Sequence, residues 1–394
     1  METIVDLEGS SAATKAFDNG GAGSHPSLPE REGSLAIAQV APLYESVPPK
    51  LYGGTERIVS YLTEELVSAG HDVTLFASGD SRTKARLVPV RPRSLRLDEH
   101  RADPLAHHLL MLERVVQESR RFDIIHFHCD YLHFPLSRRL PVPSLTTLHG
   151  RLDLADLVPV YREYSDAPLV SVSDAQRTPL PWANWQATIH HGLPSSFGAA
   201  PSKPGTYLAF LGRISPEKRV DRAIEIARRT GMEIKIAAKV DAADRVYFDE
   251  VIRPLLTDRR VEFLGEIGEN EKIPFLSEAY ALLFPIDWPE PFGLVMIEAM
   301  ACGTPVIAYR RGSVPEVIDD GVTGYVVGSI GEAVRAVQRI GGLSGAACRS
   351  VFERRFTSKR MAQDYVKTYR SLIRRAVGRA SGPAPRSVES SRAA

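Results

Sequence analysis

Short apolar runs alternate with helical patterns along most of the chain. The run LAIAQV at 35–40 is typical of a buried strand, and residues 55–70 place apolar side chains at helical spacing up to Gly70. The first half continues with four more predicted strands, at 71–78, 122–128, 143–149 and 167–173. Because these strands are continuously apolar and alternate with helical or irregular segments, the pattern predicts a parallel sheet covered on both faces.

The alternation stops at residues 198–205 and then restarts. The segment GAAPSKPG contains two prolines and two glycines and is typical of a linker. A strand at 206–212 and a helix at 220–231 follow, and then five predicted strands, at 232–238, 261–265, 279–286, 304–309 and 323–327. We therefore expect an α/β protein of two doubly wound, Rossmann-like domains that face a central cleft, with ligands at the carboxyl ends of the strands.

The two ends of the chain differ from this pattern. Residues 1–33 are rich in Gly, Ser and Ala and are predicted to be a disordered extension, and 378–394 a disordered tail. The last periodic stretch, at 358–377, is predicted to be a helix. The expected domains are then residues 34–200 and 201–357.

Composition narrows the class of protein. Hydrophobic residues make up 43% and charged residues 25% of the chain, as in globular proteins, and 394 residues make two domains the default. Lys and Arg number 49 against 48 for Asp and Glu, which argues against a nucleic-acid binder. No apolar run has the ~20 residues of a membrane span, and the N-terminus lacks the apolar segment of a secretory signal. Three widely spaced cysteines, Cys129, Cys302 and Cys348, favour a reducing compartment, so we expect a cytoplasmic protein.

The segment WPEPFGLVMIEAMACG places two glutamates after a buried strand. Glu290 lies in a loop that two prolines restrict, and Gly293 lets the chain turn tightly into a helix. A helix start is a ready anion site, and Glu298, one turn inside, could accept hydrogen bonds from both hydroxyls of a ribose. A plain loop charge and a partner of the helix dipole explain these two glutamates equally well on the local sequence alone.

Two cations follow the first strand of the second half. In LGRISPEKRVD, Arg213 and Lys218 are both placed to reach into the cleft. A guanidinium and an ammonium could hold a diphosphate and stabilise the charge that builds on it as it leaves. The alternative is a solvated loop with a helix cap.

A glycine pair and five histidines occupy similar positions in the first half. Gly53 and Gly54 precede a helix, so the backbone there could approach a phosphate or sugar, although a plain turn is the alternative. His149 ends an apolar run before a glycine, which favours a side chain directed into the cleft. Metal binding by His126, His128 and Cys129 lacks a further ligand at convincing spacing, so no metal site is expected. The other histidines, including His190 and His191, are interpreted as structural.

In this order, these groups of residues resemble the family-4 retaining glycosyltransferases of GT-B architecture, over roughly residues 34–377. The most specific part is EPFGLVMIE, in which seven residues separate the two glutamates, followed by AMACGTPVIA and GSVPEVIDDGVTGYVV. The motif GRISPEK is nearly as specific.

The resemblance implies a hexosyltransferase that retains the anomeric configuration and needs neither metal nor cofactor. Its donor would be a UDP- or GDP-sugar, and its acceptor a hydroxyl of a saccharide, a lipid-linked molecule or a small molecule bound by the first domain. Glu298 would contact the ribose, Glu290 the donor sugar, and His149 the reacting sugar. The diphosphate would lie near Arg213, Lys218, the amides of Phe292, Gly293 and Leu294, and the pair Gly53 and Gly54. The helix at 358–377 would cross back to the first domain.

The chain departs from the family pattern at three places. Arg219 stands where a glycine often follows the lysine, AKVDAAD at 238–244 replaces a glycine-rich turn, and Gly312-Ser313 replaces a Gly-Gly pair. Alternative interpretations are a GT-B phosphorylase, a nucleotide-sugar epimerase or a non-catalytic nucleotide-sugar-binding protein. The basic segments 82–101 and 370–379 suit either peripheral contact with an anionic inner membrane face or a solvated surface. The oligomeric state is left open.

Overall fold

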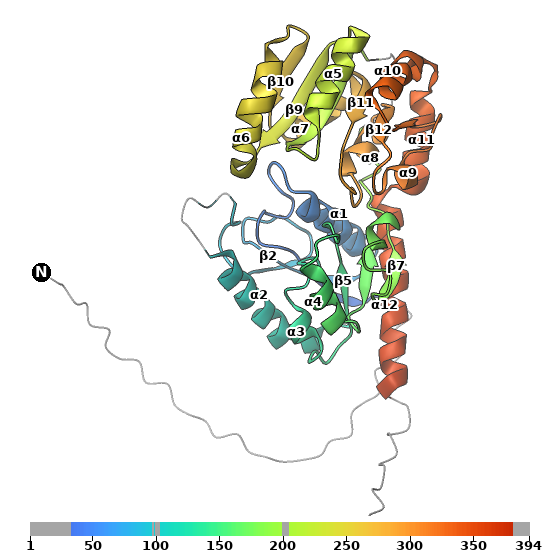
Figure 1. Ribbon diagram of the computed structural model, residues 1–394. Coiled ribbons are helices and arrows are strands. Elements are labelled where there is room, and N and C mark those ends of the chain that lie inside the picture. The colour runs from blue at the N-terminus through green and yellow to red at the C-terminus, as the bar shows by residue number, and fades with distance from the viewer. Residues whose placement is uncertain (1–32, 97, 99–102, 199–204, 381–394) are drawn as a thin grey trace, which may run out of the picture. The chain divides into compact units, whose positions relative to one another are not determined.

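The computed structural model describes residues 33–96, 98, 103–198 and 205–380, and from Ser34 onward they form one compact unit (Figure 1). The predicted N-terminal extension up to residue 32 and the tail from residue 381 lie outside the described residues.

The first half forms a sheet of seven parallel strands in the order β3-β2-β1-β4-β5-β6-β7. The order reverses between β1 and β4, so the loops after these two strands leave the sheet in opposite directions and open a crevice at their carboxyl ends. The strands are β1 (Ala36–Val40), β2 (Asp72–Ala77), β3 (Arg86–Pro89), β4 (Ile124–Phe127), β5 (Ser144–Thr147), β6 (Leu169–Ser171) and β7 (Trp185–Thr188).

Side chains of β1 alternate between two buried clusters, one on each face of the sheet. Ile37 packs with apolar residues of α1 (Gly54–Ser68), whose buried side chains recur at Ile58, Leu62 and Leu66. Val40 packs on the other face with α2 (Pro104–Glu118). This double coverage explains the continuous apolar strands. The remaining helical segments of this half are η1 (Ser119–Arg121), α3 (Phe134–Ser137), α4 (Leu157–Glu163) and η2 (Ala175–Arg177).

The second half forms a sheet of six parallel strands in the order β10-β9-β8-β11-β12-β13. Its order reverses between β8 and β11, which places the loops after these strands at a second crevice. The strands are β8 (Tyr207–Ile214), β9 (Ile234–Val240), β10 (Val261–Gly265), β11 (Ala279–Phe284), β12 (Val306–Tyr309) and β13 (Gly324–Val327). The predicted α/β fold with two doubly wound sheets is confirmed.

Helices again cover both faces of the second sheet. α5 (Val220–Thr230) and α10 (Ile330–Arg339) share one buried cluster with the strands, and α8 (Leu294–Ala301) and α11 (Gly345–Arg355) share the other. The remaining helical segments are η3 (Ala242–Asp244), α6 (Arg245–Tyr247), η4 (Phe248–Ile252), η5 (Arg253–Thr257), α7 (Glu269–Ser277), α9 (Val314–Val317) and η6 (Ile340–Gly342).

The last helix, α12 (Ser358–Ala380), packs against the first half of the chain (Figure 1). Its Tyr365 lies in the same buried cluster as Leu62 and Leu66 of α1, and Ser358 Oγ donates to Glu65 Oε1 at 2.6 Å. α12 begins at the residue predicted, but it continues to Ala380, three residues into the segment predicted to be a disordered tail.

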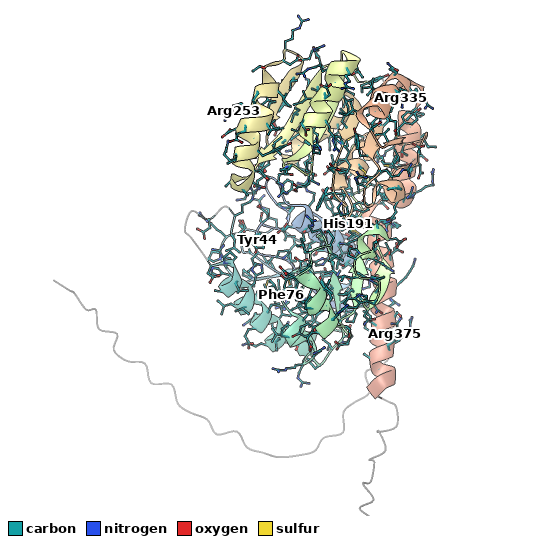
Figure 2. All side chains as sticks on the ribbon, viewed as in Figure 1. Tyr44, Phe76, His191, Arg253, Arg335 and Arg375 are labelled. Carbon is teal, nitrogen blue, oxygen red and sulfur yellow. The ribbon has the colours of Figure 1, made fainter. Side chains whose placement is uncertain are left out.

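The hydrophobic pattern missed two strands, β3 and β7, because both are short and half-buried edge strands. β3 lies inside the basic segment 82–101, where three arginines form ion pairs. Arg86 contacts Glu118 at 2.7 Å, Arg91 contacts Asp98, and Arg96 contacts Glu45. In the second basic segment, Arg375, labelled in Figure 2, donates to Gln186 at 2.8 Å. Because intramolecular contacts occupy these four arginines, the interpretation of the two basic segments as solvated surface is favoured over contact with a membrane.

Candidate active site

All ten predicted site residues line one cavity of about 520 Å³. Loops after β1 and β5 contribute from the first sheet, and the ends of β8 and β11 with the start of α8 contribute from the second. Tyr44 and His191, both labelled in Figure 2, also line it. The predicted residues in the cavity are Gly53, Gly54, His149, Arg213, Lys218, Glu290, Phe292, Gly293, Leu294 and Glu298.

Lys218 and Glu290 form a direct ion pair in this cavity. The Lys218 ammonium also lies 4.7 Å from the centre of the Trp288 ring, and the Trp288 indole donates to Glu290 Oε2 at 2.9 Å. Both side chains of the pair are largely buried, so the pair is held in one orientation before any ligand arrives. A diphosphate that bound Lys218 would therefore lie within reach of the Glu290 carboxylate.

Asp287 joins the two loops that carry this pair. Its backbone amide donates to the Glu217 carbonyl at 2.8 Å, and its carboxylate contacts Arg219 at 3.2 Å and Arg222 at 2.7 Å. Arg219, which stands where the family often has glycine, has a left-handed backbone with φ of 55°. That conformation costs a non-glycine residue about 1 kcal/mol, and the ion pairs with Asp287 and Asp221 offset it.

The departure from the family pattern at Gly312-Ser313 supports the loop that carries Glu290. Gly312 has φ of +51°, and a Cβ there would lie 2.3 Å from the Glu290 carbonyl oxygen, so only glycine fits. Next to it, the Ser313 amide donates to that carbonyl at 3.0 Å, and Ser313 Oγ donates to the Phe292 carbonyl at 2.8 Å. The serine thus adds a hydrogen bond that a second glycine could not make.

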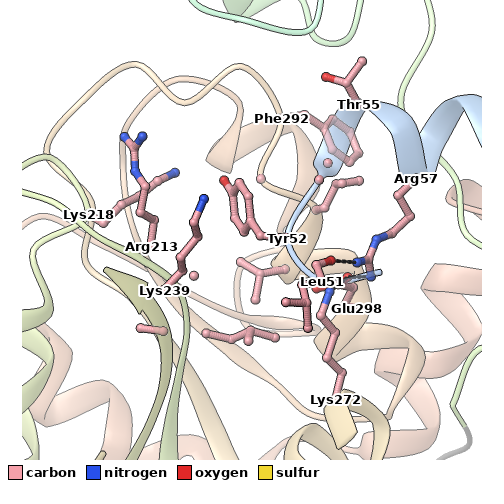
Figure 3. Close-up of a pocket in the computed structure, with 18 of the residues that line it drawn as sticks. Leu51, Tyr52, Thr55, Arg57, Arg213, Lys218, Lys239, Lys272, Phe292 and Glu298 are labelled. Carbon is pink, nitrogen blue, oxygen red and sulfur yellow. Dashed lines mark hydrogen bonds and ion pairs between the residues drawn. The ribbon is translucent and has the colours of Figure 1, made fainter. Parts of the chain in front are cut away.

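Arg213 is surrounded by carboxylates. Its guanidinium contacts Glu217 at 2.6 Å, Asp244 at 3.7 Å and Asp241 at 3.8 Å. The two aspartates belong to the segment AKVDAAD at 238–244, which stands where the family has a glycine-rich turn. This segment therefore places negative charge beside Arg213. Burial disfavours the charged form, but Glu217, Tyr52 and Asp244 outweigh it and raise the pKa of Arg213. Figure 3 shows Arg213 near Lys218 and Lys239 at one end of the cavity.

The turn into α8 brings the predicted backbone amides into the cavity wall. Gly293 has φ of +80°, a conformation that favours glycine, and it is the residue before the first helical turn. The first amides of a helix have no carbonyl partner within it, so those at Leu294 and Val295 are donors for an anion. Gly54 lies close by, since a Cβ built on it would be 3.5 Å from Leu294 Cδ1.

Glu298 is buried and contacts two cations that the sequence pattern did not single out. Lys272 Nζ on α7 lies 3.2 Å from Glu298 Oε1, and Arg57 Nη1 on α1 lies 3.7 Å from it (Figure 3). Burial alone would raise the pKa of Glu298, but Lys272 and Arg57 outweigh it and hold that pKa below its ordinary value. Arg57 also pairs with Glu269, to which Tyr61 donates at 3.1 Å.

His149 lines the cavity as a neutral ring, because burial lowers its pKa to about 3. Its Nε2 lies 2.9 Å from His128 Nδ1, and His128 Nε2 lies 2.8 Å from Gln39 Oε1. His126 contacts Tyr369 and Thr147, each at 2.7 Å. Side-chain hydrogen bonds thus occupy both ring nitrogens of His126 and His128. Over the residues described, no group of three His, Cys, Asp or Glu side chains is arranged to hold a metal ion.

Family models match both halves of the chain. The family model for Glycosyltransferase Family 4 matches residues 52–193, and the model for Glycosyl transferases group 1 matches residues 196–340. A glycogen synthase of Mycobacterium tuberculosis is 26% identical over 346 residues, which cover 74% of this chain and 83% of that protein. A D-inositol 3-phosphate glycosyltransferase of Mycolicibacterium smegmatis is 31% identical over 198 residues, or 48% of this chain and 45% of that one.

Solved structures share the fold. AviGT4, a glycosyltransferase involved in avilamycin A biosynthesis, superposes with a TM-score of 0.68 at 24% identity, covering 86% of this chain and 98% of that one. HepE of Anabaena, solved in complex with UDP and glucose, has a TM-score of 0.68 at 18% identity, covering 86% of this chain and all of that one.

The fold and the cavity define a glycosyltransferase of the GT-B class. The chain belongs to the family-4 type within that class, with the Glycosyl transferases group 1 domain as its second half. Among the described helices, none is both long and apolar enough to span a bilayer.

Proposed function

We propose that this enzyme is a retaining, metal-independent hexosyltransferase that uses a UDP- or GDP-sugar and a hydroxyl acceptor. The main observation behind this proposal is that one cavity, beside the first turn of α8, is lined by Arg213, Lys218, Glu290 and Glu298. This set combines cations and free amides for a diphosphate with carboxylates for sugar and ribose hydroxyls. The similar fold of HepE, solved with UDP and glucose, supports a nucleotide-sugar donor.

The reaction we propose is substitution on one face of the donor sugar. The acceptor oxygen attacks the anomeric carbon as the bond to the diphosphate oxygen breaks, and the diphosphate leaves with that electron pair. The acceptor proton passes to the departing diphosphate oxygen. Arg213 and Lys218 stabilise the negative charge that develops there, supplying positive charge that other transferases take from a metal ion. Glu290, held by Lys218 and Trp288, positions the sugar through a hydroxyl.

The donor is found by a thermal-shift screen against UDP-, GDP- and ADP-sugars, since a ligand of the folded state raises the melting temperature. Transfer by the matching donor is then followed by proton NMR of the product. The proposal predicts the donor's anomeric configuration in the product and full activity in excess EDTA. An inverted anomer, or loss of activity with the chelator, would contradict it.

Incubation of the enzyme with its donor alone separates this proposal from an epimerase. A transferase leaves the configuration of the nucleotide sugar unchanged apart from slow hydrolysis, whereas an epimerase converts it.

The three free cysteines are buried and suit a reducing compartment, which supports a cytoplasmic reaction.

A further inference from the structure

A second cavity, of about 390 Å³, adjoins the donor cavity on the side of the first sheet. The two cavities share Tyr44, Thr55, Glu56, His149 and Gly150 in their walls. All of its described lining residues come from the first half, and the remaining ones are Pro42, His108, His128, Cys129, Asp130, Tyr131 and Leu132. A molecule bound there would meet a donor sugar at His149 without displacing the nucleotide.

Two acidic side chains, Glu56 and Asp130, line this second cavity. Glu56, in the first turn of α1, is only 5% exposed, and over the described chain no cation contacts its carboxylate. Asp130, just after β4, is an exposed residue that also lines the cavity. No lysine or arginine is present among the described residues of the wall.

The neighbouring histidines do not supply positive charge. Burial lowers the pKa of His108, His128 and His149, so all three are neutral at pH 7. His108 is also fully engaged, because Nε2 accepts from the Leu43 amide at 3.1 Å and Nδ1 contacts the Pro104 carbonyl at 2.6 Å. Burial raises the pKa of Glu56 to about 7 and also raises that of Asp130. At pH 8, the carboxylates of Glu56 and Asp130 are therefore the charges that an incoming molecule meets.

Two carboxylates with no neighbouring cation should bind some classes of acceptor more favourably than others. Each carboxylate can accept hydrogen bonds from two or more hydroxyl groups, which suits a polyol. A phosphate or carboxylate on the ligand would instead face the like charge of the buried Glu56 and of Asp130, and such juxtaposition is unfavourable.

We propose that this second cavity is the acceptor site, and that Glu56 and Asp130 select an acceptor whose bound part is an uncharged polyol, rejecting phosphorylated or carboxylated ones. The inference rests on the proposed transferase function and names the substrate class of that reaction.

The test uses the full-length enzyme with its established donor and matched pairs of acceptors at pH 8. Glucose is compared with glucose 6-phosphate, and myo-inositol with an inositol phosphate, by the initial rate of nucleotide release. The neutral member of a pair is expected to have at least about 10-fold higher kcat/KM. Glu56→Gln and Asp130→Asn are expected to reduce this ratio by about 10-fold each. Asp130→Asn, which lines the second cavity but not the donor cavity, should also leave the KM for donor within about 2-fold. Glu113→Gln, on the exposed side of α2, is the matched control and should leave the ratio unchanged.

Preference for the phosphorylated members, or an unchanged ratio in both cavity variants, would overturn the proposal. Failure of every neutral compound, in transfer and in titration against the enzyme with UDP or GDP present, also counts against it. These failures leave donor binding intact, whereas an enzyme that binds no nucleotide sugar at all would refute the proposed function instead.

Discussion

Arg57 on α1 and Glu298 on α8 lie 3.7 Å apart, between Nη1 and Oε1, so a cation from the first half of the chain contacts the carboxylate expected to bind the ribose. Both side chains are about 5% exposed. With Lys272, Arg57 keeps Glu298 ionised in a site where burial alone would favour its protonated form.

Glu298→Gln should therefore destabilise the protein as well as weaken donor binding. The substitution leaves buried Arg57 and Lys272 without their shared carboxylate, which costs about 3 kcal/mol of unfolding free energy at pH 7. Because the folded-state pKa of Glu298 lies below its ordinary value of 4.5, its contribution is complete above that value and is lost as the pH falls below it. Urea unfolding at pH 7 and pH 4 measures the difference.

Glu269→Gln is the control, since Glu269 also pairs with Arg57 but its side chain is 38% exposed. We expect it to cost about 1 kcal/mol or less. Equal losses for the two variants, or a Glu298→Gln loss that does not shrink in acid, would contradict this description of the cluster.

Glu56 should make stability fall as the pH rises. Burial raises the pKa of its carboxyl from 4.5 to about 7 in the folded protein. Between these values the unfolded chain releases the proton while the folded chain keeps it, so about 3 kcal/mol of stability is lost on going from pH 4 to pH 8. Glu56→Gln removes this titration and should raise the melting temperature relative to the parent at pH 8 but not at pH 4. A pH-independent difference between the two proteins would show that Glu56 has an ordinary pKa.

Arg219 allows backbone conformation to be separated from side-chain contacts. Arg219→Gly loses the ion pairs but relieves the left-handed backbone, so its unfolding free energy should lie within about 1 kcal/mol of the parent. Arg219→Ala loses the same contacts and keeps the strain, so it should be less stable than Arg219→Gly by about 1 kcal/mol. Equal stability of the two variants in urea unfolding would remove the backbone from the explanation.

Gly312→Ala should impair catalysis through the Glu290 loop. A methyl group there would lie 2.3 Å from the Glu290 carbonyl oxygen, so the loop that carries Glu290 must shift. We expect kcat to fall by about 10-fold or more because a shift of about 1 Å in a positioned group has effects of that size. Gly321→Ala is the control: it also has positive φ, but its Cβ would meet nothing within 4 Å. A Gly312→Ala variant with parental kcat would show that this close approach does not position Glu290.

The sequence predicts those parts of the structure that depend on local pattern. Apolar runs marked the central strands. Arg213 lies at the end of β8 and Glu290 in the loop after β11, where parallel sheets bring side chains together. Arg57 and Lys272 were not predicted, because on a helix each resembles an ordinary surface cation. Their contact with Glu298 arises only when three helices from distant parts of the chain pack together.

The residues that hold the loops of the site in place could not be predicted from the local sequence pattern either. Asp287 reads as one more loop acid, yet it binds the loops that carry Lys218 and Glu290. Similarly, Ser313 was noted only as a departure from Gly-Gly, and its hydrogen bond to Phe292 depends on the loop fold.

The central claim is that Lys218 and Arg213 act on the diphosphate as it leaves. The most direct test measures kcat and the dissociation constant for donor in Lys218→Ala, with Lys367→Ala as control because that lysine is 77% exposed on α12. The account predicts that kcat falls about 100-fold while the dissociation constant changes by less than about 10-fold, since the charge develops mainly in the transition state. An unchanged kcat, or a loss confined to donor affinity, would contradict it.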